Sequence, residues 1–203
     1  MTTILVTGFG PFPRAPVNPT GPVVRALERT VRMPRVRLVA HVFATSYAGV
    51  DRELPALIAT HRPDVLLMFG LATRARLLRI ETLARNAVAL TPDVSGTSLQ
   101  RRTIVPGAAA TLALPVPTRP LLRTLREAQV PATLSRDAGS YLCNYLCWRA
   151  AEAAAAPDGP RLAAFIHVPP VRRGVSHVKR ITHDDLVRGG GRLLAALAQA
   201  ARR

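Results

Sequence analysis

The sequence predicts an α/β fold, a three-layer α/β/α sandwich around a twisted and largely parallel central sheet. Two observations lead to this prediction. Short apolar runs alternate along the chain with longer segments of helical composition, which is the order found in βαβ units. After Asp64, the run that ends at Gly70 is apolar throughout, as expected of a strand that helices cover on both faces.

The apolar runs place the strands in chain order. Residues 4–7 form a first buried strand, and further strands are expected at 37–42, 64–70, 132–135 and 161–168. Pro169 and Pro170 end the last of these, because proline cannot donate to a sheet ladder. Residues 79–90 form one long strand or two short ones. Residues 92–106 contain Gly and Ser without a clear period, which indicates a loop or a short hairpin.

Helices are expected at 20–29, 50–61, 118–128, 139–156 and from about 182 towards 201. The helix that starts near Gly139 is the clearest, because its second half is rich in alanine and a Pro-Asp-Gly-Pro turn at 157–160 ends it. Gly139 and Ser140 provide a turn and a cap for its start. Thr182 is expected to cap the last helix.

The length of 203 residues suits one domain over residues 1–203, and a hydrophobic content of 48% can form its core without disulfides or metals. No stretch approaches the roughly 18 consecutive apolar residues of a membrane span. The first residues lack the basic region and cleavage site of a signal peptide. With only two cysteines, the chain is expected to be cytoplasmic, with reduced thiols.

The formal net charge of +16 raises the possibility of a nucleic-acid partner, because phosphate neutralisation drives such binding. The basic residues are nevertheless scattered, in runs no longer than two, and aromatic residues make up only 4% of the chain. They do not form a platform for base stacking. A solvated, arginine-rich surface is the favoured interpretation. A basic α/β module that binds nucleic acid, with affinity falling steeply in salt, is the non-enzymatic alternative.

Cys143 is the strongest candidate nucleophile. It lies where the strand 132–135 gives way to the alanine-rich helix, in the expected first turn of that helix. Backbone N–H groups and the helix dipole stabilise a thiolate there, and the thiolate is the form that attacks a carbonyl carbon. Cys147, one turn further on and beside Trp148, suits a small buried hydrophobe. Two cysteines four residues apart, without a second pair of ligands, do not predict a metal site.

His167 ends the last apolar strand, immediately before Val168 and Pro169, which places an imidazole at the edge of the sheet. Such a histidine is often structural, but one that faces a cysteine at a helix N-terminus can serve as its base. Glu81 is the candidate third member, because a carboxylate bonded to the imidazole fixes its tautomer. An ion pair of Glu81 with Arg79 or Arg85 is the structural alternative.

The loop after the first strand reads Thr-Gly-Phe-Gly-Pro-Phe (7–12). Pro11 and the lack of a third glycine argue against a dinucleotide-binding loop. Phe9 and Phe12 suit an apolar pocket for a small ring, or a packing contact. Asn18, which precedes Pro19, can present an amide to such a ring or form an ordinary turn.

Five motifs in order resemble the pyrrolidone-carboxylate peptidase (pyroglutamyl peptidase I) family of cysteine peptidases, over most of the chain and at similar spacing. They are Thr-Gly-Phe-Gly-Pro-Phe (7–12), Val-Asn-Pro-Thr (17–20), Glu81, Gly-Ser-Tyr-Leu-Cys-Asn (139–144) and Phe-Ile-His-Val-Pro (165–169). The resemblance implies a cytosolic exopeptidase, without a cofactor, that removes an N-terminal pyroglutamyl residue from blocked peptides. It implies a Cys–His–Glu triad of Cys143, His167 and Glu81, and a homotetrameric assembly. It also implies a lactam site lined by Phe9, Phe12, Tyr141 and Leu142, with Asn18 in the nearby loop.

The chain departs from the family pattern at two places. Many members have Gln-Ala-Gly-Gly-Arg where this chain has Leu71 to Ala75, and the family's Arg-Ile-Pro-Asp segment is Leu90 to Asp93 here. The resemblance places that missing arginine near the oxyanion, and Arg85 is the candidate replacement. An oxyanion donor contributes about 10²–10³ in rate, so its loss predicts slow turnover or a different acyl substrate. Another small N-acyl amide is therefore the alternative substrate.

Overall fold

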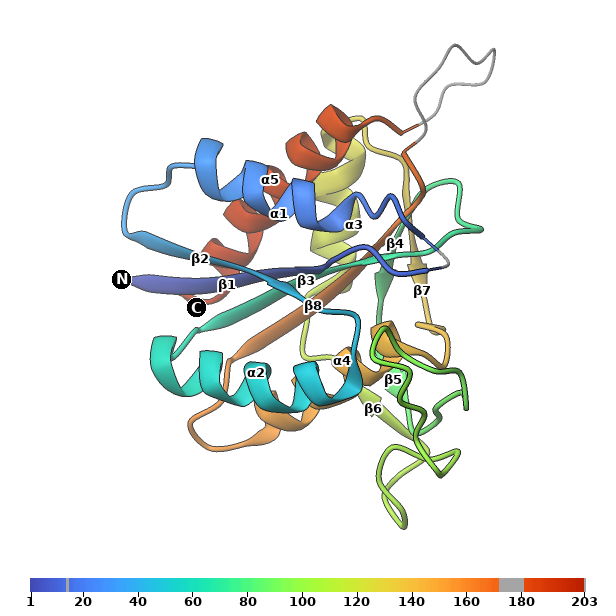
Figure 1. Cartoon of the computed structure of the whole chain (residues 1–203). Coiled ribbons are helices and arrows are strands. Elements are labelled where there is room, and N and C mark those ends of the chain that lie inside the picture. Colours follow the sequence, from blue (N-terminus) through green and yellow to red (C-terminus); the bar gives the residue numbers. More distant parts are fainter. Residues whose placement is uncertain (14, 172–180, 203) are drawn as a thin grey trace.

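The structure, a computed structural model, describes residues 1–13, 15–171 and 181–202. A six-stranded sheet has the order β2-β1-β3-β8-β4-β7, and β5 pairs with β6 in a separate two-stranded sheet (Figure 1). The strands are β1 (Thr2–Phe9), β2 (Val36–Phe43), β3 (Val65–Leu71), β4 (Leu78–Glu81), β5 (Leu83–Arg85), β6 (Thr111–Ala113), β7 (Ala132–Ser135) and β8 (Leu162–Val168). The helices are α1 (Thr20–Thr30), α2 (Tyr47–His61), α3 (Thr118–Glu127), α4 (Leu142–Ala155) and α5 (His183–Ala200).

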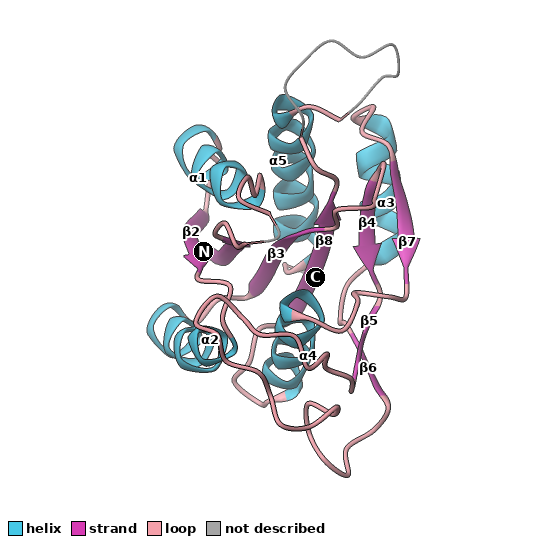
Figure 2. Cartoon of the chain, turned by 45° about the vertical axis from the view of Figure 1, so that its right-hand side comes forward, coloured by secondary structure: helices cyan, strands magenta, loops and turns pink. Residues whose placement is uncertain are grey.

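Helices cover both faces of the large sheet, as the sequence predicts. Figure 2 shows α1, α3 and α5 on one face and α2 and α4 on the other. The strands β1, β2, β3 and β8 run parallel to one another, and β1 is buried along its whole length. The exception is β4, which pairs antiparallel with β8 and parallel with β7. The predicted largely parallel α/β sandwich is therefore confirmed.

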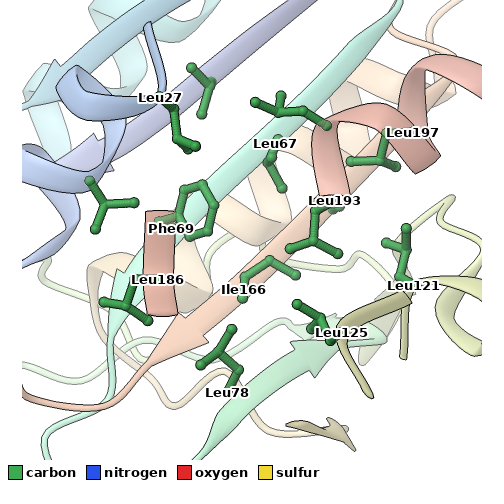
Figure 3. Packing of buried hydrophobic residues seen from close by; sticks show 14 of the residues in the cluster. Leu27, Leu67, Phe69, Leu78, Leu121, Leu125, Ile166, Leu186, Leu193 and Leu197 are labelled. Carbon is green, nitrogen blue, oxygen red and sulfur yellow. The ribbon is translucent and has the colours of Figure 1, made fainter. Parts of the chain in front are cut away.

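Each face of the sheet has its own apolar core. Figure 3 shows the core under α1, α3 and α5, where Leu67, Phe69 and Ile166 from the strands meet Leu27 and Leu193 from the helices. On the opposite face, a second cluster of buried residues packs the sheet against α2 and α4, with Trp148 fully enclosed. Burial of such side chains stabilises the fold by about 1.5–3 kcal/mol each.

The structure corrects the start of the alanine-rich helix. Gly139 makes the expected turn, with φ +82°, but α4 begins at Leu142. Tyr141 is the N-cap in extended conformation, and no side chain caps the helix, so the expected cap by Ser140 is wrong. Because the chain stays extended through Tyr141, Cys143 becomes the second residue of the helix.

Residues 79–90 contain two short strands in different sheets, because Thr82 turns the chain away from β7. The backbone N–H of Thr82 still donates to Ser135, while its carbonyl accepts from Leu114 beside β6. The strand β6 is missing from the sequence-based expectations. It has only three residues, 111–113, and they are largely exposed. Helix α2 begins at Tyr47 and not at Val50, because Ser46 accepts a hydrogen bond from the N–H of Gly49 as its cap.

No helix among the described residues is both long and apolar enough to cross a membrane. The expected cap of the last helix is present. The Thr182 hydroxyl accepts from the N–H of Asp185 at 3.1 Å, and the Asp185 carboxylate accepts from the N–H of Thr182 at 2.9 Å. This reciprocal capping box satisfies N–H groups that the first turn of α5 leaves unpaired.

Replacing Thr182 by Ala removes the capping hydroxyl, so we expect the free energy of unfolding to fall by about 1 kcal/mol. The measurement is urea denaturation followed by far-ultraviolet circular dichroism. Thr182→Ser retains the hydroxyl and serves as the matched control, with stability close to that of the unmodified chain. Equal stability of all three proteins would contradict the capping role.

Candidate active site

The site lies where β8 runs between β3 and β4. In the sheet register, His167 of β8 is opposite Gly70 of β3 on one side and Arg79 of β4 on the other. Successive strand residues point to opposite faces, so His167, Arg79 and Glu81 share the face of α2 and α4. Ile80 lies in the core of the other face. The strand alternation thus separates the polar site from the apolar core under α1, α3 and α5.

Glu81 and His167 form a buried pair. Oε1 of Glu81 lies 2.7 Å from Nδ1 of His167, with Glu81 at 0% and His167 at 5% exposure. Nε of Arg79 lies 3.5 Å from the same carboxylate oxygen. Within the described chain, the buried Oε2 of Glu81 has no hydrogen-bond partner. A carboxylate removed from water requires positive partners to offset its lost hydration, and His167 and Arg79 provide them at Oε1.

The surroundings of His167 favour its protonated form. Burial by itself lowers the pKa of His167, but the adjacent Cys143 and the hydrogen bond with Glu81 outweigh burial and raise that pKa to about 9. The imidazole ring is therefore predominantly an imidazolium at neutral pH. Its Nδ1–H is directed to Glu81, which leaves Nε2 for a second partner.

Cys143 lies at the start of α4, next to His167 and over β3. A Cβ atom at Gly70 would come within 2.8 Å of the Cys143 Sγ and 2.5 Å of the Phe165 ring, so only glycine fits beneath the thiol. The first turn of α4 contains no acidic residue and no capping side chain. Its unpaired N–H groups and the helix dipole therefore face this end, where they can stabilise a thiolate or an oxyanion.

The two cysteines differ as the sequence predicts. Cys143 is partly exposed at the site, whereas Cys147 is fully buried among apolar residues. Burial, reinforced by the charges of Cys143 and Glu81, raises the pKa of the Cys147 thiol well above its ordinary value. Cys147 is a buried hydrophobe, and its thiol is inert at neutral pH.

Arg79 connects the buried pair to the segment that precedes Cys143, and sequence reasoning missed this role. Its Nη2 donates to the Ser135 hydroxyl at 2.6 Å and to the Asp137 carbonyl at 2.7 Å, while its Nε faces Glu81. Arg85 was the candidate for the missing oxyanion-region arginine. Its guanidinium pairs with the Asp137 carboxylate instead, and Arg85 does not line the cavity beside Cys143.

A cavity of about 420 Å³ opens beside Cys143 and His167. All five residues predicted to bind substrate line it, namely Phe9, Phe12, Asn18, Tyr141 and Leu142. Phe12 and Tyr141 face each other with ring centroids 6.4 Å apart. Phe9 and Leu142 are almost fully buried, and with Phe12 and Tyr141 they form an apolar wall of the cavity.

The Asn18 amide is largely engaged by the protein itself. Its NH₂ group donates to the Gly10 carbonyl at 2.9 Å, and its oxygen accepts from both the N–H and the hydroxyl of Thr20. Asn18 therefore fixes the loop that carries Phe9 and Phe12. One amide hydrogen remains for a ligand.

A second loop supports Tyr141. The Tyr141 hydroxyl donates to the Pro92 carbonyl at 2.9 Å, and the next residue, Asp93, accepts hydrogen bonds from the N–H groups of Tyr47, Ser95 and Thr97. Burial alone raises the pKa of Asp93, but the Ser95 hydroxyl and these N–H groups lower it below its usual range. The sequence indicates a loop or a short hairpin here, and the structure has a loop. The hydrogen bonds that converge on Asp93 include one from the Tyr47 N–H at the start of α2, which is far away in the sequence.

Of the residues that depart from the family pattern, Leu71 lines the cavity, whereas Leu90 is 46% exposed and lies outside its lining. In the described part of the chain, no three His, Cys, Asp or Glu side chains cluster in a way that could hold a metal ion.

The α/β sandwich, with a cysteine at a helix N-terminus beside a carboxylate-paired histidine, defines the class of cysteine peptidases. The family model described as pyroglutamyl peptidase matches residues 2–183, and the chain belongs to this family. It is 32% identical over 193 residues to pyrrolidone-carboxylate peptidase 1 of Ralstonia nicotianae, covering 93% of this chain and 89% of the relative. It is 30% identical over 205 residues to the pyrrolidone-carboxylate peptidase of Cupriavidus necator, covering 98% and 93%.

Solved structures show the same fold. The pyrrolidone carboxyl peptidase from Thermococcus litoralis superposes with a TM-score of 0.88 at 25% identity, covering 97% of this chain and 93% of that one. A mutant pyrrolidone carboxyl peptidase from Pyrococcus furiosus gives 0.86 at 27% identity, covering 97% and 98%.

Replacing Gly70 by Ala forces the new methyl group against the Phe165 ring and the Cys143 Sγ. We expect a loss of stability of about 1–3 kcal/mol, as for other overpacked cores, together with a displaced thiol. Urea denaturation measures the first effect, and the rate of iodoacetamide labelling at Cys143 measures the second.

Gly191→Ala is the matched control, because its Cβ meets nothing closer than Val31 at 3.6 Å and lies in a helix. If both variants matched the parent protein in stability and labelling, the close approach at Gly70 would be contradicted.

Replacing Glu81 by Gln keeps a hydrogen-bond acceptor but removes the negative charge. Because that charge helps to raise the pKa of His167, we expect the pKa to fall from about 9 towards or below its ordinary value of 6.5. NMR titration of the His167 ring signal, assigned by its loss in His167→Gln, measures this shift. An unchanged pKa in the Glu81→Gln protein would contradict the electrostatic account.

The raised pKa of His167 also makes the stability of the fold depend on pH. The pKa of His167 in the folded state lies above its ordinary value, so protonation of His167 stabilises the fold. This contribution to the free energy of unfolding is fully present below pH 6.5. This contribution is lost as the pH rises through about 9.

Proposed function

We propose that this chain is a cysteine exopeptidase that hydrolyses the amide bond after an N-terminal pyroglutamyl residue. Cys143 is the nucleophile, His167 the acid and base, and Glu81 the residue that orients His167. The observation that carries the proposal is the 2.7 Å Glu81–His167 pair beside a cysteine at the start of α4. Family membership and the names of the relatives support the choice of substrate.

In the proposed reaction, Sγ of Cys143 attacks the pyroglutamyl carbonyl carbon, and the oxyanion that forms accepts hydrogen bonds from N–H groups at the start of α4. The C–N bond then breaks, and His167 donates its proton to the departing amine, which leaves a thioester on Cys143. Water attacks the thioester while His167 accepts its proton. The C–S bond breaks, pyroglutamate leaves, and Cys143 is released as a thiolate beside the protonated His167, as at the start. The reaction draws only on protein groups and water, with no cofactor.

The proposed lactam site is the wall formed by Phe9, Phe12, Tyr141 and Leu142. A pyroglutamyl ring is small and carries no charged amine, which suits an apolar wall with few polar contacts. The remaining amide hydrogen of Asn18 can serve one ring oxygen. Leu71 in the cavity wall favours a second candidate, hydrolysis of another small N-acyl amide, because it replaces the amide side chain found in many relatives.

The organisation of the protein belongs to the same proposal. Residues 1–203 form one domain, which assembles as a homotetramer in the cytoplasm. The resemblance to the family supports the assembly. The two free thiols, Cys143 and Cys147, support a reducing compartment. The alternative of a nucleic-acid-binding module leaves the buried Glu81–His167 pair without a role.

Replacing Cys143 by Ala removes the nucleophile, so release of a fluorophore from a pyroglutamyl amide is expected to fall by at least about 10⁴-fold. Cys147→Ala is the matched control on the same helix, and it should retain most of the activity. The assay uses reduced protein, with circular dichroism to verify folding. Appreciable turnover by a folded Cys143→Ala protein would overturn the proposed mechanism. Turnover only of other N-acyl amides would support the second candidate.

A further inference from the structure

The cavity beside Cys143 is lined by a positive charge, that of Arg74, that the mechanism does not use. Its lining residues include Arg74 and Arg79, in addition to His167. The one carboxylate among the lining residues belongs to Asp137, which already pairs with Arg85. Glu81 pairs with His167 and Arg79, so Arg74 is the cation of the lining that has no anionic partner among the described residues.

Arg74 is the more available of the two arginines. It is exposed on the segment after β3, and it makes no hydrogen bond or ion pair with any other residue that the structure describes. Arg79 uses Nη2 and Nε for Ser135, Asp137 and Glu81, and its Nη1 has no partner in the described chain. A guanidinium group with free N–H donors is well suited to a carboxylate.

The pyroglutamyl ring does not need these cations. The ring is neutral, and the aromatic side chains of Phe9, Phe12 and Tyr141 provide an apolar wall for it. The cations therefore serve the part of the substrate that lies beyond the scissile bond. We infer that the site favours pyroglutamyl peptides that carry a carboxylate close to that bond, with Arg74 as the main specificity residue.

This inference rests on the proposed function. The carboxylate can come from an Asp or Glu side chain directly after the pyroglutamyl residue, or from the free C-terminus of a pyroglutamyl dipeptide. Both sources place one negative charge within a few bonds of the reacting carbonyl. Both also benefit from the net charge of +16, so the test must separate local recognition from general attraction.

The experiment compares kcat/KM for pyroglutamyl dipeptides with Asp, Ala or Lys in the second position, each with a free and an amidated C-terminus. Release of the amino acid is followed with an amine-reactive dye. Exposed ion pairs are worth about two- to fivefold in such ratios. We expect the amidated Asp peptide to exceed the Lys peptide by at least this factor. Each peptide with a free C-terminal carboxylate should have a higher kcat/KM than its amidated form. Both preferences should weaken in high salt.

Arg74→Gln is expected to lower the Asp-to-Lys ratio by about two- to fivefold. Arg76→Gln is the matched control, because Arg76 is also exposed, lies two residues away and does not line the cavity. Both variants lose one positive charge, but only the first changes the cavity wall. Equal ratios for all peptides, or an equal fall in both variants, would overturn the inference.

Cleavage of the amidated Ala peptide, which carries no charged group, tests the proposed function separately. If it is not cleaved, the proposed function fails and the inference fails with it. If it is cleaved but charge in the second position has no effect, the inference alone fails.

Discussion

The buried pair of Glu81 and His167 is the interaction on which the site depends. A carboxylate at 0% exposure costs several kcal/mol in lost hydration unless positive partners lie close to it. Two features of the sheet supply these partners. The antiparallel pairing of β4 with β8 places Arg79 opposite His167, and the alternation along β4 puts Glu81 on the same face. The direction of one short strand thus brings the acid, the imidazole and the guanidinium group together.

Cys143 reaches this pair because several distant segments fix its position. Gly70 leaves room beneath Sγ, and Arg79 joins the segment before α4 to the sheet. On the other side of the cavity, Asp93 orders the loop whose Pro92 carbonyl accepts from Tyr141. The residues of the site are therefore held by strands and by loops that hydrogen bonds constrain. Such rigid support is what a preorganised site requires. Cys147, on the same helix, faces the core and takes no part.

Much of this arrangement could be predicted from the sequence. Apolar runs located the buried strands of the large sheet, because strands such as β3 have no polar face. The order of the motifs indicated Cys143, His167 and Glu81, which the structure brings together, although their catalytic roles remain a proposal. The ion pair of Glu81 with Arg79, given as an alternative, is also present. The start of α4, the direction of β4, the exposed strand β6, the bonds of Arg79 to Ser135 and Asp137, and the contacts of Asp93 could not be predicted. Each depends on pairing between segments far apart in the chain, which local composition does not record.

The most direct test of the account is to identify the covalent intermediate. Protein that is turning over a pyroglutamyl amide is quenched in acid, and its mass and peptide map are then determined. The account predicts a pyroglutamyl group in thioester linkage on Cys143 and none on Cys147. Continued product release without an adduct on rapid quenching, or an adduct on any other residue, would contradict the assignment of Cys143 as the nucleophile.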